Sequence, residues 1–263
     1  MRWLVLFSCL LVSVAWAKPA SITLTLASQQ DNGHMYYHEL LKEALAANGI
    51  ELIIETPAEH IPQKRVVKMV QNNQLSLTWL IETKQRNRQF IPINVTLTNG
   101  LIGQRVLLIP DGAQELFDEI ETLEQLKASG LVAGLGKEWF DVDVWRHNGL
   151  GAYLQDGEWR ELYAKLSEDG EVNYFPRGFT EIYSEARIYS HLEIEKRLLL
   201  VYERDFKFYL SREAAMHKPM IQAALKKAKK TGLMDRLIKK YWYDSFIKLD
   251  PDNRTVIFLD LPD

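Results

Sequence analysis

LSLTWLIETKQRNRQF, residues 75–90, joins an apolar strand to a polar turn that carries two arginines. LSLTWL is typical of a buried strand, and Trp79 offers an apolar wall near the end of that strand. The turn that follows contains Arg86 and Arg88. Arginine is the side chain best shaped to hold a carboxylate, because its guanidinium donates two parallel hydrogen bonds. The stretch therefore indicates either a carboxylate-binding turn or a surface loop with ordinary arginines.

Strands and helices alternate on the N-terminal side of this stretch. Alternating apolar residues predict a strand over 21–27, and residues 35–49 have the pattern of an amphipathic helix that ends at Gly49. A second strand over 50–55 and a helix over 63–71 follow. This order predicts an α/β unit with a largely parallel sheet.

The same alternation resumes after residue 100. An apolar strand is predicted over 101–110, and further strands and helices are predicted over 120–128, 131–136, 141–148, 159–167, 171–175, 180–192 and 196–211. Two helices with apolar stripes, over 219–230 and 233–242, form the tail. No Pro- or Ser-rich linker separates the two blocks, so we expect two lobes joined by extended strands with a ligand cleft between them.

The first 17 residues have the form of a secretory signal peptide. Arg2 precedes an apolar run over 3–14, and AWA at 15–17 has the small-x-small form of a cleavage site. The run is short for a permanent membrane helix, so we favour cleavage over a retained anchor. The only cysteine, Cys9, lies in this segment. We therefore expect a secreted mature chain without disulfides, cysteine metal sites or a cysteine nucleophile.

The charge balance gives no sign of nucleic-acid binding. The formal net charge is −3, and loss of Arg2 with the leader makes it −4. One basic cluster, formed by Lys226, Lys227, Lys229 and Lys230, lies on a predicted helix whose other face is apolar. This pattern favours a solvated helix face over an anion-binding patch.

Motifs for catalysis and metal binding are mostly absent. No G-x-S-x-G nucleophile elbow occurs, and GLVAGLGK at 130–137 lacks the spacing of a phosphate loop because Glu138 follows its lysine. Such a glycine-rich turn still leaves both plain turn geometry and anion contact open. His34 and His38 are four residues apart without a third ligand, so no metal site is predicted. Asp141 is most simply a helix-capping group, and no cofactor is implied.

The order and spacing of these segments resemble the family 3 solute-binding proteins, the amino-acid-type periplasmic binding proteins. The resemblance covers essentially the whole mature chain and rests on LSLTWLIETKQRNRQF, TNGLIGQRVLLI at 98–109 and LVAGLGKEWFDVDVWRHNGL at 131–150. In that family a Thr-Pro-Glu-Arg turn follows the third strand, and its arginine binds the α-carboxylate of the ligand. Here Thr83 and Arg86 keep the ends of that turn, whereas Lys84 and Gln85 replace its proline and glutamate.

YFPRG, residues 174–178, resembles a mark of a divergent branch of this family. The same branch has a W-x-D element, here 139–141, and a closing segment, here 254–262. Amino-acid-binding members have an aspartate that pairs with the ligand ammonium near the end of the strand before this loop. Arg177 and Gly178 occupy the matching positions. A cation does not hold an ammonium, so this departure speaks against an ordinary α-amino acid as the ligand.

The resemblance implies an α/β, type II periplasmic binding protein fold with two α/β lobes, a central cleft and two strand crossovers. The first lobe is expected to contain residues 18–104 and 204–263, and the second residues 105–203. The crossing strands are expected near 101–109 and 198–210.

A basic ligand site is expected where the lobes meet. Arg86, Arg177 and Lys137 would supply positive charge, and the aromatic and polar residues expected around them are Trp79, Trp139, Phe175, Tyr36 and Thr83. Such a site suits a small anion, namely a carboxylate with an apolar part. The alternative for Arg177 is a structural ion pair with Glu181 four residues on.

The resemblance implies a monomeric periplasmic protein that captures an anionic or amino-acid-like small molecule, with no enzymatic activity and no cofactor. Ligand binding would favour the closed form of the two lobes, and the partner would be an ABC-type permease or a membrane sensor. A sensing or interaction protein whose aromatics fill the cleft is one alternative. A cyclic-acid dehydratase-like enzyme is the other, with Glu82, Asp141 and Glu181 as acid–base candidates.

Overall fold

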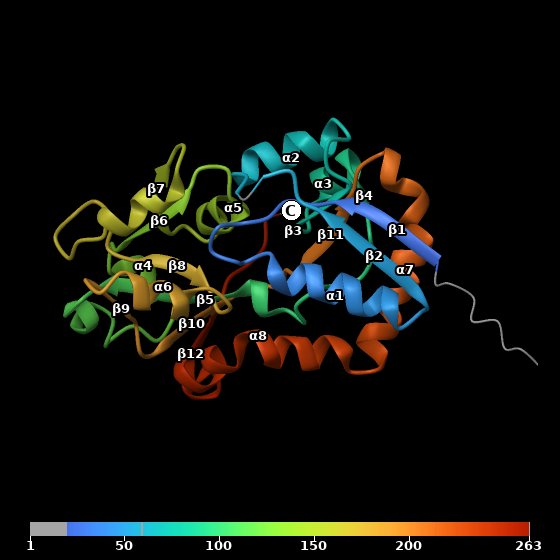
Figure 1. Cartoon of the computed structure of the whole chain (residues 1–263). Helices are drawn as coiled ribbons and strands as arrows, with labels where there is room; N and C mark the ends of the chain where they lie inside the picture. Colours follow the sequence, from blue (N-terminus) through green and yellow to red (C-terminus); the bar gives the residue numbers. More distant parts are fainter. Residues whose placement is uncertain (1–19, 59, 263) are drawn as a thin grey trace, which may run out of the picture.

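The computed structural model describes residues 20–58 and 60–262 and shows two α/β lobes side by side (Figure 1). The expected leader, residues 1–17, lies outside the described residues. No helix in the described part of the chain combines the length and apolar character needed to cross a membrane.

The first lobe is built on two small sheets. Strands β1 (Ala20–Thr25) and β2 (Ile50–Glu55) pair in parallel, with Ala20 opposite Ile50. Strand β11 (Phe206–Leu210) pairs antiparallel with both β3 (Leu77–Ile81) and β4 (Ile91–Pro92). The helices of this lobe are α1 (Met35–Ala46), α2 (Gln63–Gln71), α3 (Lys84–Gln89), α7 (Lys218–Lys230) and α8 (Leu233–Leu249).

The second lobe centres on strand β5 (Gln104–Pro110), whose five middle residues are all buried. The sheet runs in the order β12 (Thr255–Phe258), β10 (Leu198–Val201), β5, β8 (Phe175–Gly178), and β9 (Leu192–Ile194) also pairs with β5. Strands β6 (Val132–Gly136) and β7 (Gly151–Gln155) form a separate parallel pair. The helices are α4 (Leu123–Ala128), α5 (Phe140–His147) and α6 (Ile182–Ile188).

Short 3-10 segments complete the chain, at Leu101–Gly103, Ala113–Leu116, Trp159–Ala164, Glu213–His217 and Pro251–Asn253. The helix expected over 159–167 is therefore a 3-10 segment that stops at Ala164.

Buried apolar side chains form three clusters. The largest begins between α1, α7 and α8 and continues into the second lobe through Val106, Phe175 and Phe179. A second cluster lies wholly within the second lobe, around Trp145 and Tyr174. A third, smaller cluster lies under α2 in the first lobe. The continuity of the first cluster means that the lobes share apolar contacts at their junction.

Two crossing segments run side by side between the lobes, over 97–104 and 201–206 (Figure 1). The Asp205 carboxylate accepts hydrogen bonds from the backbone N–H groups of Thr98 and Gly100, and from the Thr98 hydroxyl at 2.7 Å. The segments approach so closely at Gly103 that a Cβ there would lie 2.0 Å from the Tyr202 carbonyl oxygen. Glycine is therefore needed at this junction.

The C-terminal segment makes a third link between the lobes, so its last residues do not lie in the first lobe, to which residues 204–263 were expected to belong. Helix α8 belongs to the first lobe, but β12 pairs in parallel with β10 in the sheet of the second. Ile257 and Leu259 are buried in the second-lobe core, and the side chain of Arg254 donates hydrogen bonds to the carbonyls of Glu195 and Leu198. Residues 255–261 thus lie with the second lobe, because β12 pairs with β10 and the side chains of Ile257 and Leu259 are buried there, whereas Val256 and Phe258 are exposed.

Candidate functional site

Arg86 is held at the end of β3 by its own turn. Thr83 caps α3, and its hydroxyl accepts a hydrogen bond from the Arg86 backbone N–H at 3.1 Å. The Arg86 guanidinium donates to the Ile81 carbonyl oxygen at 2.7 Å. Burial lowers the pKa of Arg86, while Tyr209 and the second-lobe carboxylate of Asp141 act against this. Within the described residues no carboxylate forms an ion pair with Arg86.

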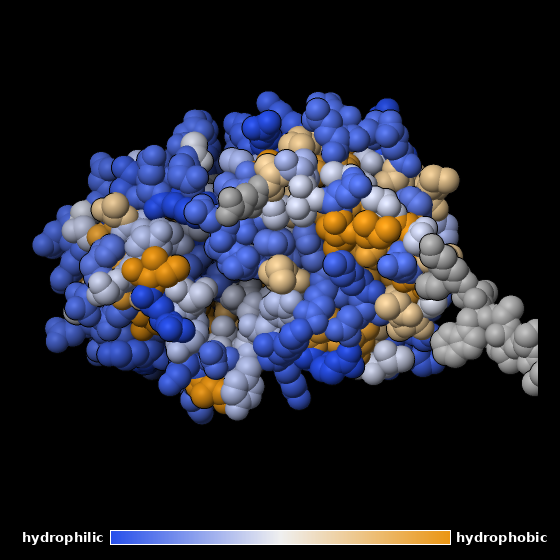
Figure 2. Space-filling model, in the orientation of Figure 1, coloured by the Kyte–Doolittle hydropathy of each residue, from blue (hydrophilic) through white to orange (hydrophobic). Residues whose placement is uncertain are grey.

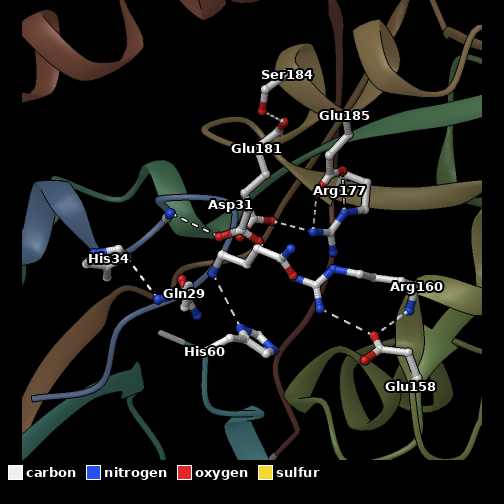
Figure 3. Close-up of polar contacts among 12 residues, drawn as sticks. Gln29, Asp31, His34, His60, Glu158, Arg160, Arg177, Glu181, Ser184 and Glu185 are labelled. Atoms are coloured by element: carbon white, nitrogen blue, oxygen red, sulfur yellow. Dashed lines mark hydrogen bonds and ion pairs between the residues drawn. The ribbon is translucent and has the colours of Figure 1, made fainter. Parts of the chain in front are cut away.

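Arg177 has its charge compensated within its own lobe. The guanidinium donates to the Glu185 carboxylate at 2.7 and 2.6 Å and lies 3.0 Å from the Glu181 carboxylate (Figure 3). It also lies 4.5 Å from the ring centre of Trp159, with two further rings nearby. Burial alone would lower the pKa of Arg177, but the two carboxylates outweigh burial and raise it well above its usual range.

The expected cluster of three cations is therefore not what the structure brings together. The alternative ion pair of Arg177 with Glu181 is present, and Glu185 is a further partner that the sequence did not indicate. Lys137 is exposed and forms an ion pair with Asp156 at 2.9 Å, at the end of β6. It is the first residue after the buried end of β6.

The expected aromatic residues stack within their own lobes. Trp79, which is partly buried, stacks on Tyr37 with ring centres 4.6 Å apart. In the second lobe Trp139 stacks on the fully buried Phe175 at 5.9 Å and contacts Trp159 at 5.5 Å. Among the described residues no ring contact joins Trp79 to Trp139, so the two tryptophans do not close the lobe boundary by stacking on each other.

Tyr36 is a core residue, which corrects its expected place among the ligand contacts. Only 2% of its surface is exposed, and its hydroxyl donates to the Leu97 carbonyl oxygen. Its neighbour Tyr37 is the one that stacks on Trp79. The sequence did not distinguish the two tyrosines because adjacent helical residues differ only in which side they face.

Asp31 and Arg160 form an ion pair across the two lobes, at 2.8 Å (Figure 3). Asp31 lies in the loop between β1 and α1, where it also accepts a hydrogen bond from the Gly33 N–H at 3.0 Å. Arg160 stacks over Trp159 at 4.4 Å and contacts Glu158 at 3.3 Å. Neither Asp31 nor Arg160 was indicated by the sequence, because their pairing depends on how the lobes meet.

Glu181 presents a carboxylate at the lobe boundary. It follows β8, and 45% of its side chain is exposed although it contacts Arg177. Burial and, next, the Glu181 charge raise the pKa of Tyr37 in the other lobe, which places this carboxylate near the first lobe. A Cβ at Gly178 would lie 3.0 Å from a Glu181 carboxylate oxygen. The absence of a side chain at Gly178 therefore leaves room for this carboxylate above the turn.

Asp141 is part of a buried network instead of a cap or an acid–base group. Its carboxylate accepts from Arg105 Nε at 2.7 Å and from the Tyr202 hydroxyl at 2.9 Å. Burial favours the neutral carboxyl, but Arg105 outweighs this and lowers the pKa of Asp141. The signal for this network was the charged Arg105 in LIGQRVLLI, a segment whose only other polar side chain is Gln104.

The two histidines of α1 and its cap serve the local backbone. His34 Nδ1 accepts from the Gln29 N–H at 3.0 Å, and His38 Nε2 contacts the Ala27 carbonyl oxygen at 3.1 Å. Burial and, next, His34 lower the pKa of His38 to about 4. In the described ranges, no group of three or more His, Cys, Asp or Glu side chains could hold a metal ion.

The glycines of 130–137 serve close contacts within the second lobe. A Cβ at Gly136 would lie 2.6 Å from Trp139 Nε1, and one at Gly134 would lie 2.9 Å from Leu162. The Lys137 N–H is already bonded to the Gln155 carbonyl oxygen at 2.9 Å. This arrangement explains the glycine pattern by turn and strand geometry.

Hydrophilic residues cover most of the face shown in Figure 2, including the boundary between the lobes, while apolar residues gather over β1 and β2. The stacked rings of Trp79 and Trp139 lie in separate lobes. The Arg86 guanidinium of the first lobe has no ion pair among the described residues, and the Glu181 carboxylate of the second lobe is 45% exposed.

Comparison with solved structures establishes the fold. An amino acid ABC transporter substrate-binding protein from Streptococcus pneumoniae, bound to L-arginine, has a TM-score of 0.62 at 14% identity, covering 84% of this chain and 94% of its own. An ancestral amino acid-binding protein, a precursor of cyclohexadienyl dehydratase, has a TM-score of 0.60 at 12% identity, with coverages of 84% and 95%. A mutant arginine-binding protein from T. maritima has a TM-score of 0.58 at 15% identity, with the same coverages.

No protein-family model matches the sequence, and a search of curated proteins finds no significant match. The structural likeness confirms the predicted type II periplasmic binding fold with its α/β lobes. The relation to a branch marked by YFPRG stays a prediction.

Proposed function

We propose that this chain is a secreted solute-binding protein that encloses a small carboxylate-bearing molecule between its lobes, with Arg86 as the carboxylate-binding group. The observation that carries this proposal is that Arg86 is held in place but has no ion-pair partner among the described residues. Its backbone is fixed by the Thr83 cap and its guanidinium by the Ile81 carbonyl, yet none of the described carboxylates neutralises it. A positioned and unpaired guanidinium at a lobe boundary is suited to bind a carboxylate with two hydrogen bonds.

The charged residues of the second lobe, which form the wall opposite Arg86 in this proposal, narrow the class of ligand. Arg177 is one cation against the two carboxylates of Glu181 and Glu185, so this wall carries one excess negative charge. A ligand with a carboxylate at one end and a cationic group at the other would satisfy both walls. The repulsion between Arg177 and an ammonium, which the sequence suggested, is offset by its two partners. An amino-acid-like ligand therefore fits better than a simple anion.

The interlobe contacts support closure, and the structural neighbours support a membrane partner. The ion pair of Asp31 with Arg160 forms only when the lobes meet, so it adds to the stability of the closed form. Ligand shifts the population towards closure because it contacts both lobes. We infer a periplasmic location and a membrane partner of the ABC-permease type, in line with the ABC transporter proteins among the structural neighbours. A membrane sensor that reads the closed form is the alternative partner.

A thermal-shift screen against amino acids, aromatic acids and other carboxylates tests the proposal. A true ligand stabilises the native chain by an amount that grows with its concentration. The shift should disappear in Arg86→Ala and persist in Arg88→Ala, a matched loss of charge on the same short helix. A shift that both variants retain would place the site elsewhere, and a screen with no shift at all would remove the solute-binding proposal.

A second candidate function rests on the exposed Glu181 carboxylate beside Arg177. A carboxyl group at a ligand site could transfer protons in the dehydration of a cyclic acid. The test is incubation with cyclic carboxylic acids and detection, by mass spectrometry, of a product lighter by one water. Product formed by the wild type but not by Glu181→Gln supports this function, and unchanged substrate refutes it.

A further inference from the structure

A hollow of about 480 Å³ lies on the first lobe, and four of its eight lining residues are lysines. The loop after β4 forms one wall, Lys207 at the start of β11 another, and the last turns of α7 a third. The lining residues are Glu82, Asn94, Val95, Thr96, Lys207, Lys226, Lys229 and Lys230. Arg86 is not among them, although Glu82 directly follows Ile81, whose carbonyl oxygen accepts a hydrogen bond from the Arg86 guanidinium.

Three of the four lysines have no compensating carboxylate. Lys207 forms an ion pair with Glu82 at 2.7 Å. Lys229 donates to the Thr96 hydroxyl at 2.9 Å, which leaves its charge uncompensated. In the part of the chain that the structure describes, Lys226 and Lys230 form no ion pair. The hollow therefore collects three positive charges in a chain whose formal net charge is −3.

Helix electrostatics explain only part of this cluster. Cations in the last turn of a helix are favoured by its dipole, and this accounts for basic residues at the end of α7. Lys227 also lies in this last turn and interacts favourably with the helix dipole, but it does not line the hollow. Its ammonium donates to the Ala47 carbonyl oxygen at 2.9 Å. Lys226 and Lys230 are one turn apart, where like charges destabilise a helix. They also border a hollow whose volume lies within the usual range for small-molecule sites, about 300–1,000 Å³.

We propose that this hollow is a binding site for a small multivalent anion of the phosphate or polycarboxylate class. Ammonium groups act as compact point charges and suit such anions. The Thr96 hydroxyl lies within the same walls and can donate a further hydrogen bond. A bound anion would relieve the repulsion between Lys226 and Lys230 and so stabilise the end of α7. The proposal is independent of the solute that the lobes enclose.

Isothermal titration of the full chain with inorganic pyrophosphate tests this proposal. The double variant K226Q/K230Q removes two of the three uncompensated charges, and K239Q/K248Q removes two exposed charges from α8 as a matched control. We expect the double variant to bind pyrophosphate at least tenfold more weakly than wild type and the control to differ by less than twofold. Arg86→Ala should bind it like wild type, which separates this site from the proposed solute site.

A second arm distinguishes a free anion from a lipid headgroup. Co-sedimentation with phosphatidate vesicles, compared with phosphatidylcholine vesicles, would identify a membrane phosphate as the source if K226Q/K230Q abolishes it. Pyrophosphate binding without sedimentation would identify a free anion. Absence of both, or binding that K226Q/K230Q leaves unchanged, would overturn the proposal.

Discussion

The buried ion pair of Arg105 with Asp141 predicts a large loss of stability when only one of its two charges is removed. Their side chains are 8% and 4% exposed, and the shortest contact is 2.7 Å. Asp141→Asn keeps the shape but removes the charge, so Arg105 is left buried without its counter-ion. Removing one partner of such a pair costs about 3–5 kcal/mol. In a chain of this size each kcal/mol lowers Tm by about 2–4 °C, so Tm should fall by roughly 6–20 °C.

Urea denaturation and calorimetry of three variants test this reasoning. The double variant Arg105→Met/Asp141→Leu should recover most of the loss, because apolar replacement of a whole buried pair is often close to neutral. Asp143→Asn, an exposed neighbour on the same helix, serves as the control and should change stability by less than about 0.5 kcal/mol. A loss below about 1 kcal/mol for Asp141→Asn would refute the structural role. A double variant no more stable than Asp141→Asn would refute it as well.

Three further predictions concern the junction, the pH dependence and closure. Gly103→Ala should lower the free energy of unfolding by about 1–3 kcal/mol in urea denaturation, because its Cβ would clash with the second crossing segment. Gly151→Ala should lower it little, because the nearest atom to its Cβ would lie 3.6 Å away. The folded chain keeps the pKa of His38 at about 4, below its unfolded value, so stability should fall as pH drops from about 6.5 to 4, by up to about 3 kcal/mol. His38→Gln should flatten this dependence and the exposed control His147→Gln should not; equal profiles would contradict the assignment. Arg160→Gln should weaken binding of a screened ligand severalfold while unfolding changes by less than about 1 kcal/mol, and unchanged affinity would show that the interlobe pair does not favour closure.

The fold was largely predictable because its signals are local. The helix expected over 35–49 occurs as α1, which ends at Ala46, three residues before Gly49, and the strand that carries Trp79 occurs as β3. Where the sequence indicated only a polar turn, the chain forms the short helix α3, which Thr83 caps. Each of these features depends on residues within one or two turns of the chain.

The candidate site was less predictable from the sequence. Its charged residues pair with residues that are distant in the sequence, or with residues that a strand-to-helix turn brings close. The pairing of Arg177 with Glu185 bridges eight residues across a strand-to-helix turn, which helical periodicity does not connect. Arg160 meets Asp31 only through the meeting of the lobes. The return of residues 255–261 to the second lobe likewise depends on an open edge of its sheet.

The most direct test of the central claim compares a ligand from the screen with its carboxamide. Isothermal titration would give the affinities of both for wild type and for Arg86→Ala. If Arg86 holds the carboxylate, wild type should bind the carboxamide at least about 30-fold more weakly, since loss of one partner of such a pair costs about 2 kcal/mol or more. Arg86→Ala should bind the two molecules almost equally. The same preference for the carboxylate in both proteins would contradict the account.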